Sequence, residues 1–149
     1  MTKKTLRRLI KVQVVVTLAL MAISNLHAKE YRINKYSATE QKVKITTIEQ
    51  LKDETKINFE VTGPYNVCLF PPGHVNAFYA TDVRKTKKWY LLDTLDSPLC
   101  PKRVKINQGE KITFSILLEK IDVNRFHVIE GEQQSGMIDW HFPNIKLEN

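Results

Sequence analysis

Hydrophobic and polar residues alternate along most of the chain beyond residue 42. The alternation is clearest over residues 56–62 and 111–119, where an aliphatic or aromatic side chain occupies every second position. A period of two places these side chains on one face of a β-strand, so that one face is buried and the other meets water. The dominant period is not the 3.6 of an amphipathic helix, although residues 48–53 could form a helical turn. The pattern therefore predicts an all-β fold.

Turn-forming residues separate the alternating segments at short intervals. Gly63-Pro64, Pro71-Pro72-Gly73 and Asn107-Gln108-Gly109 are typical of turns. Seven to nine short strands, with turn signals every 8–12 residues, are typical of an antiparallel β-sandwich. We predict strands at 43–49, 56–62, 65–70, 77–83, 88–94, 103–106, 111–119, 125–130 and 139–147.

The same period predicts which side chains form the core and where the pattern breaks. Asp93 interrupts the apolar parity of the segment 88–94, and Pro143 interrupts the last segment, where a proline indicates an edge strand or a bulge. The predicted core residues are Phe59, Val61, Trp89, Leu91, Ile112, Phe114, Ile116, Phe126, Val128, Trp140 and Ile145.

The C-terminal third of the chain carries a resemblance to known domains. Residues 107–110 (NQGE) precede the alternating segment 111–119, and FHVIEG at 126–131 is followed by WHFPNIKL at 140–147. This succession resembles the C-terminal half of a group of uncharacterised bacterial exported Ig-like β-sandwich domains. The resemblance covers about residues 105–147. It implies the fold, and it implies no activity, cofactor or site residue.

The first 28 residues have the layout of a secretory signal peptide. Residues 1–11 contain five Lys and Arg residues and no acid, and an apolar run follows over 12–23. The segment closes on Leu26-His27-Ala28, with a small residue at the expected cleavage position. The run is too short and too interrupted to predict a transmembrane span. We therefore expect an exported protein, in the periplasm or outside the cell, with residues 29–42 as a polar N-terminal arm and residues 43–149 as one β-sandwich domain.

Charge argues against nucleic acid as the partner. The chain has 23 Lys and Arg and 16 Asp and Glu, but five of the basic residues lie in 1–28, so residues 29–149 carry a net charge of only +2. A nucleic-acid-binding domain needs a basic face across the domain, and this segment lacks that excess.

Cys68 and Cys100 are the two cysteines of the chain. An even count in an exported protein favours a disulfide, here between two strands of the sandwich. The loop it would close is worth roughly 3–4 kcal/mol in the chain-entropy estimate. The alternatives are two buried free thiols, or a Cys68 thiol that acts with a histidine in catalysis.

Two further groups of side chains could carry chemistry. Arg84, Lys85, Lys87 and Lys88 fall in five residues and predict either a solvated hairpin tip or a patch that binds anions; residues 102–105 hold a second basic group. Paired carboxylates, Glu130 with Glu132 or Asp93 with Asp96, could support glycosidase chemistry, although a polar turn explains them equally.

Neither a metal site nor a catalytic motif emerges from the sequence. His74, His127 and His141 lack metal-ligand spacing, and the chain has no G-x-S-x-G element. We expect no catalytic residue, metal or cofactor. The function favoured is a non-enzymatic binding or structural module of the envelope, with an envelope protein or an anionic glycan as partner. The alternatives are a small hydrolase with a site assembled from distant loops, and a binder of anionic polysaccharide or lipopolysaccharide.

Overall fold

The computed structural model describes residues 28–33, 38, 40–131 and 140–148, and within them the fold is all-β. The predicted signal peptide lies outside these residues except for its last position, Ala28. The strands are β1 (Lys29–Arg32), β2 (Val43–Gln50), β3 (Glu54–Thr62), β4 (Tyr65–Val67), β5 (Phe78–Asp82), β6 (Lys88–Leu95), β7 (Val104–Ile106), β8 (Lys111–Glu119), β9 (Arg125–Glu130) and β10 (His141–Lys146).

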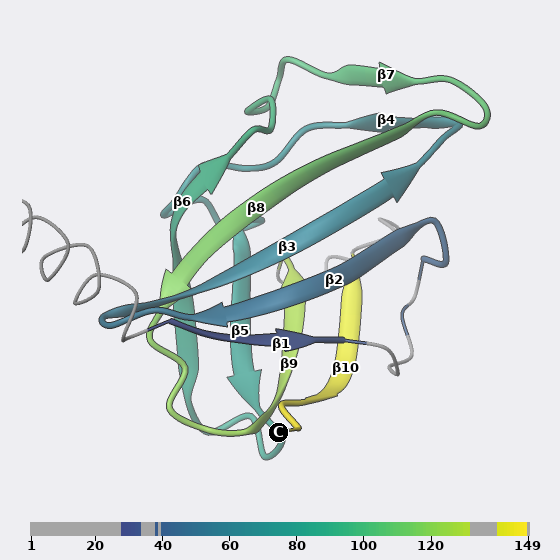
Figure 1. Ribbon diagram of the computed structural model, residues 1–149. Helices are drawn as coiled ribbons and strands as arrows, with labels where there is room; N and C mark the ends of the chain where they lie inside the picture. The colour runs from purple at the N-terminus through teal and green to yellow at the C-terminus, as the bar shows by residue number, and fades with distance from the viewer. Residues whose placement is uncertain (1–27, 34–37, 39, 132–139, 149) are drawn as a thin grey trace, which may run out of the picture.

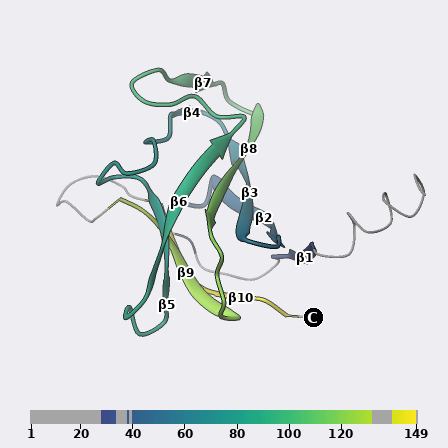
Figure 2. The same cartoon turned by 90° about the vertical axis from the view of Figure 1, so that its left-hand side faces the viewer.

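Eight of these strands form one antiparallel sheet that curls back on itself into a sandwich (Figure 1). Their order is β1-β2-β3-β8-β6-β5-β9-β10. Strand β6 belongs to both layers: its first residues pair with β5, and from Leu91 onward it pairs with β8. The register shifts between Leu91 and Asp93, where the sequence parity breaks. Figure 2 shows β6 as one long strand that runs from the hairpin with β5 up to β8.

The strand order is that of an immunoglobulin sandwich. When β1 and the short ribbon of β4 and β7 are set aside, seven strands remain, which can be lettered A to G in chain order. One layer then has the order A-B-E-D (β2, β3, β8, β6), and the other has C-F-G (β5, β9, β10). This is the arrangement of constant-type immunoglobulin domains, with the difference that strand D also pairs with strand C.

A cluster of aromatic rings fills the space between the layers. Phe59 stacks on Phe114 with ring centroids 4.9 Å apart, and Phe78 and Phe142 lie 5.4 and 5.5 Å from Phe59. Ten of the eleven predicted core residues are buried, which confirms the strand parity. The eleventh, Ile112, is partly buried against the same cluster.

The two edges of the large sheet differ from the sequence prediction in one respect. Strand β10 is an edge strand as Pro143 indicated, and its register with β9 shifts between Phe142 and Ile145, where Asn144 has a φ of 55°. The other edge is β1, which pairs with β2 although we expected residues 29–42 to be an arm. These four mostly polar, exposed residues show no alternation that could have indicated a strand. Within the described residues the strands therefore number ten, one more than predicted.

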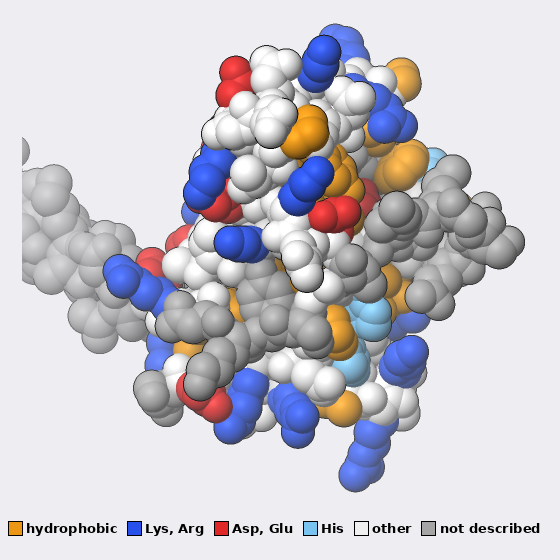
Figure 3. Space-filling view, turned by 90° about the vertical axis from the view of Figure 1, so that its right-hand side faces the viewer, with side chains coloured by type: hydrophobic (Ala, Val, Ile, Leu, Met, Phe, Trp, Pro, Cys, Tyr) orange, Lys and Arg blue, Asp and Glu red, His pale blue; other side chains and the backbone are white. Residues whose placement is uncertain are grey.

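The short strands β4 and β7 form a separate ribbon at one end of the sandwich, at the top of Figure 1. Gly63 joins β3 to this ribbon where the backbone of Asn107 passes so close that a Cβ would overlap its carbonyl oxygen. The β5–β6 hairpin turn lies at the opposite end in both ribbon views (Figures 1 and 2). On the face shown in Figure 3, Lys and Arg side chains gather toward both ends.

Candidate functional site

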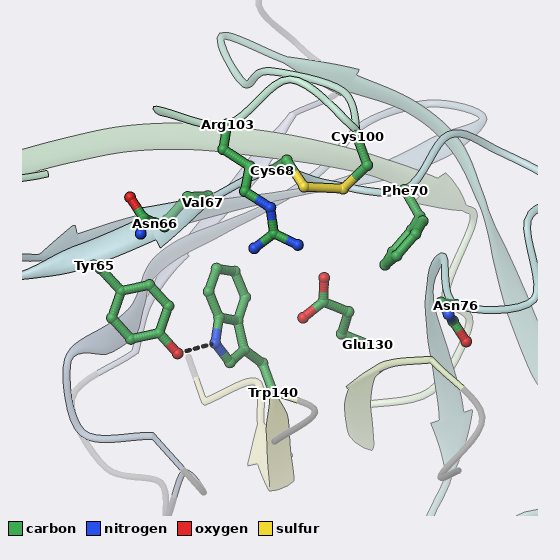
Figure 4. Close-up of a pocket in the computed structure, with 10 residues that line it drawn as sticks. All are labelled: Tyr65, Asn66, Val67, Cys68, Phe70, Asn76, Cys100, Arg103, Glu130 and Trp140. Atoms are coloured by element: carbon green, nitrogen blue, oxygen red, sulfur yellow. Dashed lines mark hydrogen bonds between the residues drawn. A yellow bond between two sulfur atoms is a disulfide. The ribbon is translucent and has the colours of Figure 1, made fainter. Parts of the chain in front are cut away.

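A pocket of about 350 Å³ lies where the ribbon meets the ends of β9 and β10 (Figure 4). Four segments far apart in the sequence supply its walls: the chain from β4 to β5, the segment that leads into β7, the last residue of β9, and the residue before β10. The lining residues are Tyr65, Asn66, Val67, Cys68, Phe70, Asn76, Cys100, Arg103, Glu130 and Trp140.

An aromatic pair connects the pocket to the core. The indole Nε1 of Trp140 donates a hydrogen bond of 3.0 Å to the hydroxyl oxygen of Tyr65, and the ring centroids are 5.9 Å apart. Trp140 is only 4% exposed and packs 6.1 Å from both Phe78 and Phe114. The indole is therefore fixed by the core on one side and by Tyr65 on the other.

Burial dominates the electrostatics of Tyr65. It raises the pKa of the hydroxyl, and the negative charges of Glu40 and Glu130 add to this, whereas the hydrogen bond from Trp140 acts in the opposite direction. The hydroxyl stays protonated at neutral pH. It can therefore donate a hydrogen bond to a ligand while it accepts one from the indole.

A cation and an anion face one another across the pocket. The guanidinium of Arg103 and the carboxylate of Glu130 point toward each other in Figure 4. Arg103 is exposed at the rim, and Glu130 is partly buried at the end of β9. The backbone N–H of Glu130 donates to the carbonyl oxygen of Trp140 at 2.9 Å, which fixes the position of the acid.

The predicted disulfide forms part of the pocket wall. Cys68 and Cys100 are bonded with Cα atoms 5.0 Å apart, within the usual range. Two backbone hydrogen bonds of 2.9 Å, from Leu69 to Pro98 and from Cys100 to Leu69, run beside it. The bridge joins the segments that flank the ribbon rather than two strands of the sandwich. It therefore holds the segment that carries Arg103 against the rest of the pocket.

Comparisons with protein-family models, with curated proteins and with solved structures find no match to this chain.

The cations predicted as an anion site lie on the β5–β6 turn, far from this pocket. The Asp82 carboxylate accepts hydrogen bonds from the backbone N–H groups of Arg84 (3.2 Å), Thr86 (2.7 Å) and Lys87 (2.7 Å). The N–H of Lys87 contributes most to lowering the pKa of Asp82. Lys85 has a φ of 57° in the same turn. A carboxylate thus organises the loop from within.

Two of the four cations have partners of their own. Lys87 forms an ion pair of 2.6 Å with Asp122, and its ammonium also lies 5.1 Å from the ring centroid of Trp89. Lys88 lies over the ring of Tyr79, 4.6 Å from its centroid. The four cations thus lie around one turn, and two of them already have partners. The interpretation of this turn as an anion-binding patch stays a prediction.

Of the three histidines beyond residue 28, two are neighbours, which their spacing in the sequence does not reveal. The rings of His127 and His141 lie 5.8 Å apart, and Nδ1 of His127 accepts the backbone N–H of Asn144 at 3.2 Å. His127 lies between the buried residues Phe126 and Val128 on β9, and it is itself only 8% exposed because β10 packs beside it. Burial, followed by the charges of His127 and Lys85, lowers the pKa of His141.

The other candidate side chains are His74 and the paired carboxylates. His74 is stacked on Phe70 at 4.4 Å. Across the residues that the structure describes, no three side chains of the types His, Cys, Asp and Glu are placed to hold one metal ion. Asp93 and Asp96 are exposed at the end of β6, and Glu132 lies outside the described residues.

The described residues include no helix long and apolar enough to cross a membrane.

Sequence reasoning missed the pocket because it considered its residues separately. The sequence predicts Trp140 as a core residue, Arg103 as part of a basic group, and Glu130 as one of a carboxylate pair or as part of a polar turn. The hydrogen bond between Trp140 and Tyr65 spans 75 residues, so no local spacing could show it. The usable signal was Cys100 between two prolines, a non-strand segment tied to a distant cysteine.

Proposed function

We propose that this protein is an exported, non-enzymatic binding module of the bacterial envelope and that the pocket beneath the ribbon is its ligand site. The layout of residues 1–28 supports export. The disulfide supports folding in an oxidising compartment. The resemblance of residues 105–147 to exported Ig-like domains supports the same compartment.

The observation that carries the proposal is a hollow with aromatic walls and a few converging polar groups. Ligand sites are usually preformed concavities of this composition, and this one has a volume of about 350 Å³. Arg103 and Glu130 present opposite charges across it. A small polar ligand that is neutral or zwitterionic can satisfy both, so we infer a sugar or an amino-acid derivative.

The lining favours binding over hydrolysis. Hydrolysis by protein groups needs a nucleophile with a base or two carboxylates. Within the described lining, Glu130 is the single carboxylate, and both sulfur atoms are joined in the disulfide. Arg103 and Glu130 can orient a ligand, but they supply neither an activated nucleophile nor a second acid.

The indole N–H signal of Trp140 provides a direct test by NMR. We expect this signal to move when ¹⁵N-labelled protein is titrated with one of three probes: N-acetylglucosamine, N,N′-diacetylchitobiose or D-alanyl-D-alanine. The signal of Trp89, which is buried in the other part of the core, should stay in place. An unmoved Trp140 signal with all three probes would contradict the proposed ligand classes.

Variants then assign the contacts. Loss of a charge-assisted hydrogen bond in Arg103→Gln or Glu130→Gln should weaken binding roughly ten- to a hundredfold. Lys105→Gln is the matched control, since Lys105 is an exposed ribbon cation outside the pocket lining. Turnover of nitrophenyl esters or glycosides that disappears in Glu130→Gln would instead support the hydrolase alternative. Amino-terminal sequencing of envelope material tests export, which a retained Met1 would refute.

A further inference from the structure

A second hollow lies beside β5 and β6, and its lining shares no residue with that of the pocket beneath the ribbon. Successive outward positions of β6 carry Lys88, Tyr90 and Leu92, and Tyr79 of β5 pairs directly with Tyr90. We call Tyr79, Lys88, Tyr90, Leu92 and the nearby Val75 the outer strip. At the usual strand rise, the three β6 positions span about 13 Å.

The outer strip is unusually apolar for an exposed surface. Tyr90 is 58% exposed and Leu92 is 47% exposed. Together with Val75, they make up half of the six large hydrophobic side chains that are exposed among the described residues. Single exposed hydrophobic residues need no explanation, but a contiguous group marks an interaction site.

A rigid loop turns this strip into a groove. A hollow of about 270 Å³ is lined by residues 73–75 of this loop and by Ala77, Phe78, Tyr79, Lys88, Tyr90 and Leu91, whereas Leu92 of the outer strip is not part of its lining. The His74 ring is stacked on Phe70, and its Nδ1 accepts the backbone N–H of Asn76 at 3.1 Å. The loop is thus held in place before any ligand arrives.

The chemistry of the groove fits an acidic oligosaccharide. The apolar C–H face of a sugar ring can pack on the exposed ring of Tyr90, while the polar groups of both stay in contact with water. Lys88 is the cation of the groove, where its ammonium lies 4.6 Å from the centroid of the Tyr79 ring, and the described lining includes no Asp or Glu. The nearby Glu119 directs its carboxylate to the backbone N–H of Tyr90 at 3.0 Å. A carboxylate or sulfate on the sugar therefore meets a positive charge.

Size distinguishes this ligand from a protein partner. A specific protein interface involves roughly 20–30 residues on each side, and the outer strip has five. A narrow groove beside two tyrosine rings suits a chain of sugar rings better than a folded surface. We propose that the outer strip binds acidic oligosaccharides through Tyr90 and Lys88, independently of the pocket beneath the ribbon.

The test compares two hexasaccharides of different charge by NMR titration of the full mature protein. Oligogalacturonate hexamer should shift the amide signals of Val75, Tyr79 and Tyr90 and leave the Trp140 indole signal unchanged. Cellohexaose, which is neutral, should bind at least severalfold more weakly. The two proposals fail separately, because Trp140 lines the pocket beneath the ribbon, whereas Val75, Tyr79 and Tyr90 line the groove.

Three variants assign the binding to the strip. Tyr90→Ala should raise the dissociation constant about three- to tenfold, whereas Tyr90→Phe keeps the ring and should retain binding. Lys88→Gln should weaken binding of the acidic hexamer and reduce its salt dependence, and Lys44→Gln on β2 is the matched exposed control. Unchanged thermal unfolding of each variant confirms the fold.

Several outcomes would overturn the proposal. One is equal affinity for cellohexaose, which removes the role of charge. Another is binding of the acidic hexamer that survives Tyr90→Ala and shifts only the turn at Arg84 and Lys85. The last is no shift with either sugar, or a strip that instead pairs with a second copy or another protein in sedimentation experiments.

Discussion

Replacement of Phe114 by alanine tests the core and the pocket together. Phe114 lies in the middle of β8, is 2% exposed, and stands directly opposite Phe59 on β3. Its ring stacks on Phe59 at 4.9 Å with an interplanar angle of 12°, and it lies 6.1 Å from the ring of Trp140. The side chain thus connects the packing of the two layers with the floor of the pocket.

The expected loss of unfolding free energy is about 3–5 kcal/mol, the usual range for a buried Phe→Ala change. The upper end of this range applies if the cavity left by the Phe114 ring stays open. Strands β3 and β6 hold β8 on both sides, so the backbone cannot move in to fill the space. Because small domains have only about 5–15 kcal/mol of stability in total, the variant should be marginally stable.

Urea unfolding followed by near-ultraviolet circular dichroism measures this loss. Thr113→Ala is the control on the exposed face of the same strand, with an expected change of about 0.5 kcal/mol or less. The indole N–H signal of Trp140 should shift in Phe114→Ala and not in the control. A loss below about 1 kcal/mol, with the fold and the slope of the transition unchanged, would refute the described parity of β8.

Three further predictions concern the disulfide, a histidine and the aromatic pair of the pocket. The double variant Cys68→Ser, Cys100→Ser should lose about 2–4 kcal/mol of unfolding free energy, and an unchanged urea midpoint would contradict this. Burial lowers the pKa of His141 in the folded state. The unfolded chain therefore binds more protons, and stability should fall as the pH drops from about 6.5 through the folded pKa. A pH series should show this decline in the parent protein and a flatter curve in His141→Gln. Tyr65→Phe leaves the buried indole N–H of Trp140 without its acceptor and should cost about 1–3 kcal/mol, whereas a neutral result would mean that water replaces the hydroxyl.

Elements with a local signal in the sequence were predictable. Strands β3 and β8 show an alternation with a period of two. This pattern is visible within a few residues of sequence, and it directly indicates which side chains are buried. The break in parity at Asp93 marked the position where β6 passes from one layer to the other. Pro143 marked the edge strand β10 in the same way. The disulfide followed from the cysteine count and the expected compartment, although its place in the fold did not.

Contacts between distant segments were not predictable at this level. Strands β4 and β7 were expected within 65–70 and 103–106, although each has only three residues, but their pairing with each other outside the large sheet had no local signal. The pocket depends on this ribbon, because Tyr65 and Arg103 reach Trp140 and Glu130 only through it. Strand β1 was not predicted, because an exposed four-residue strand needs no hydrophobic alternation. Sequence patterns thus described the framework and not the contacts between distant segments that build the site.

The position of the disulfide links the framework to the proposed function. In antibody domains a bridge joins strands B and F across the core, whereas here the equivalent strands β3 and β9 present the buried side chains of Phe59 and Phe126. Aromatic packing therefore replaces the bridge in the core, and the cysteines instead secure the ribbon that forms the pocket wall. An immunoglobulin framework carries no activity by itself, and its ligand sites lie in what is added to it. In this chain, the addition is the ribbon with its bridge.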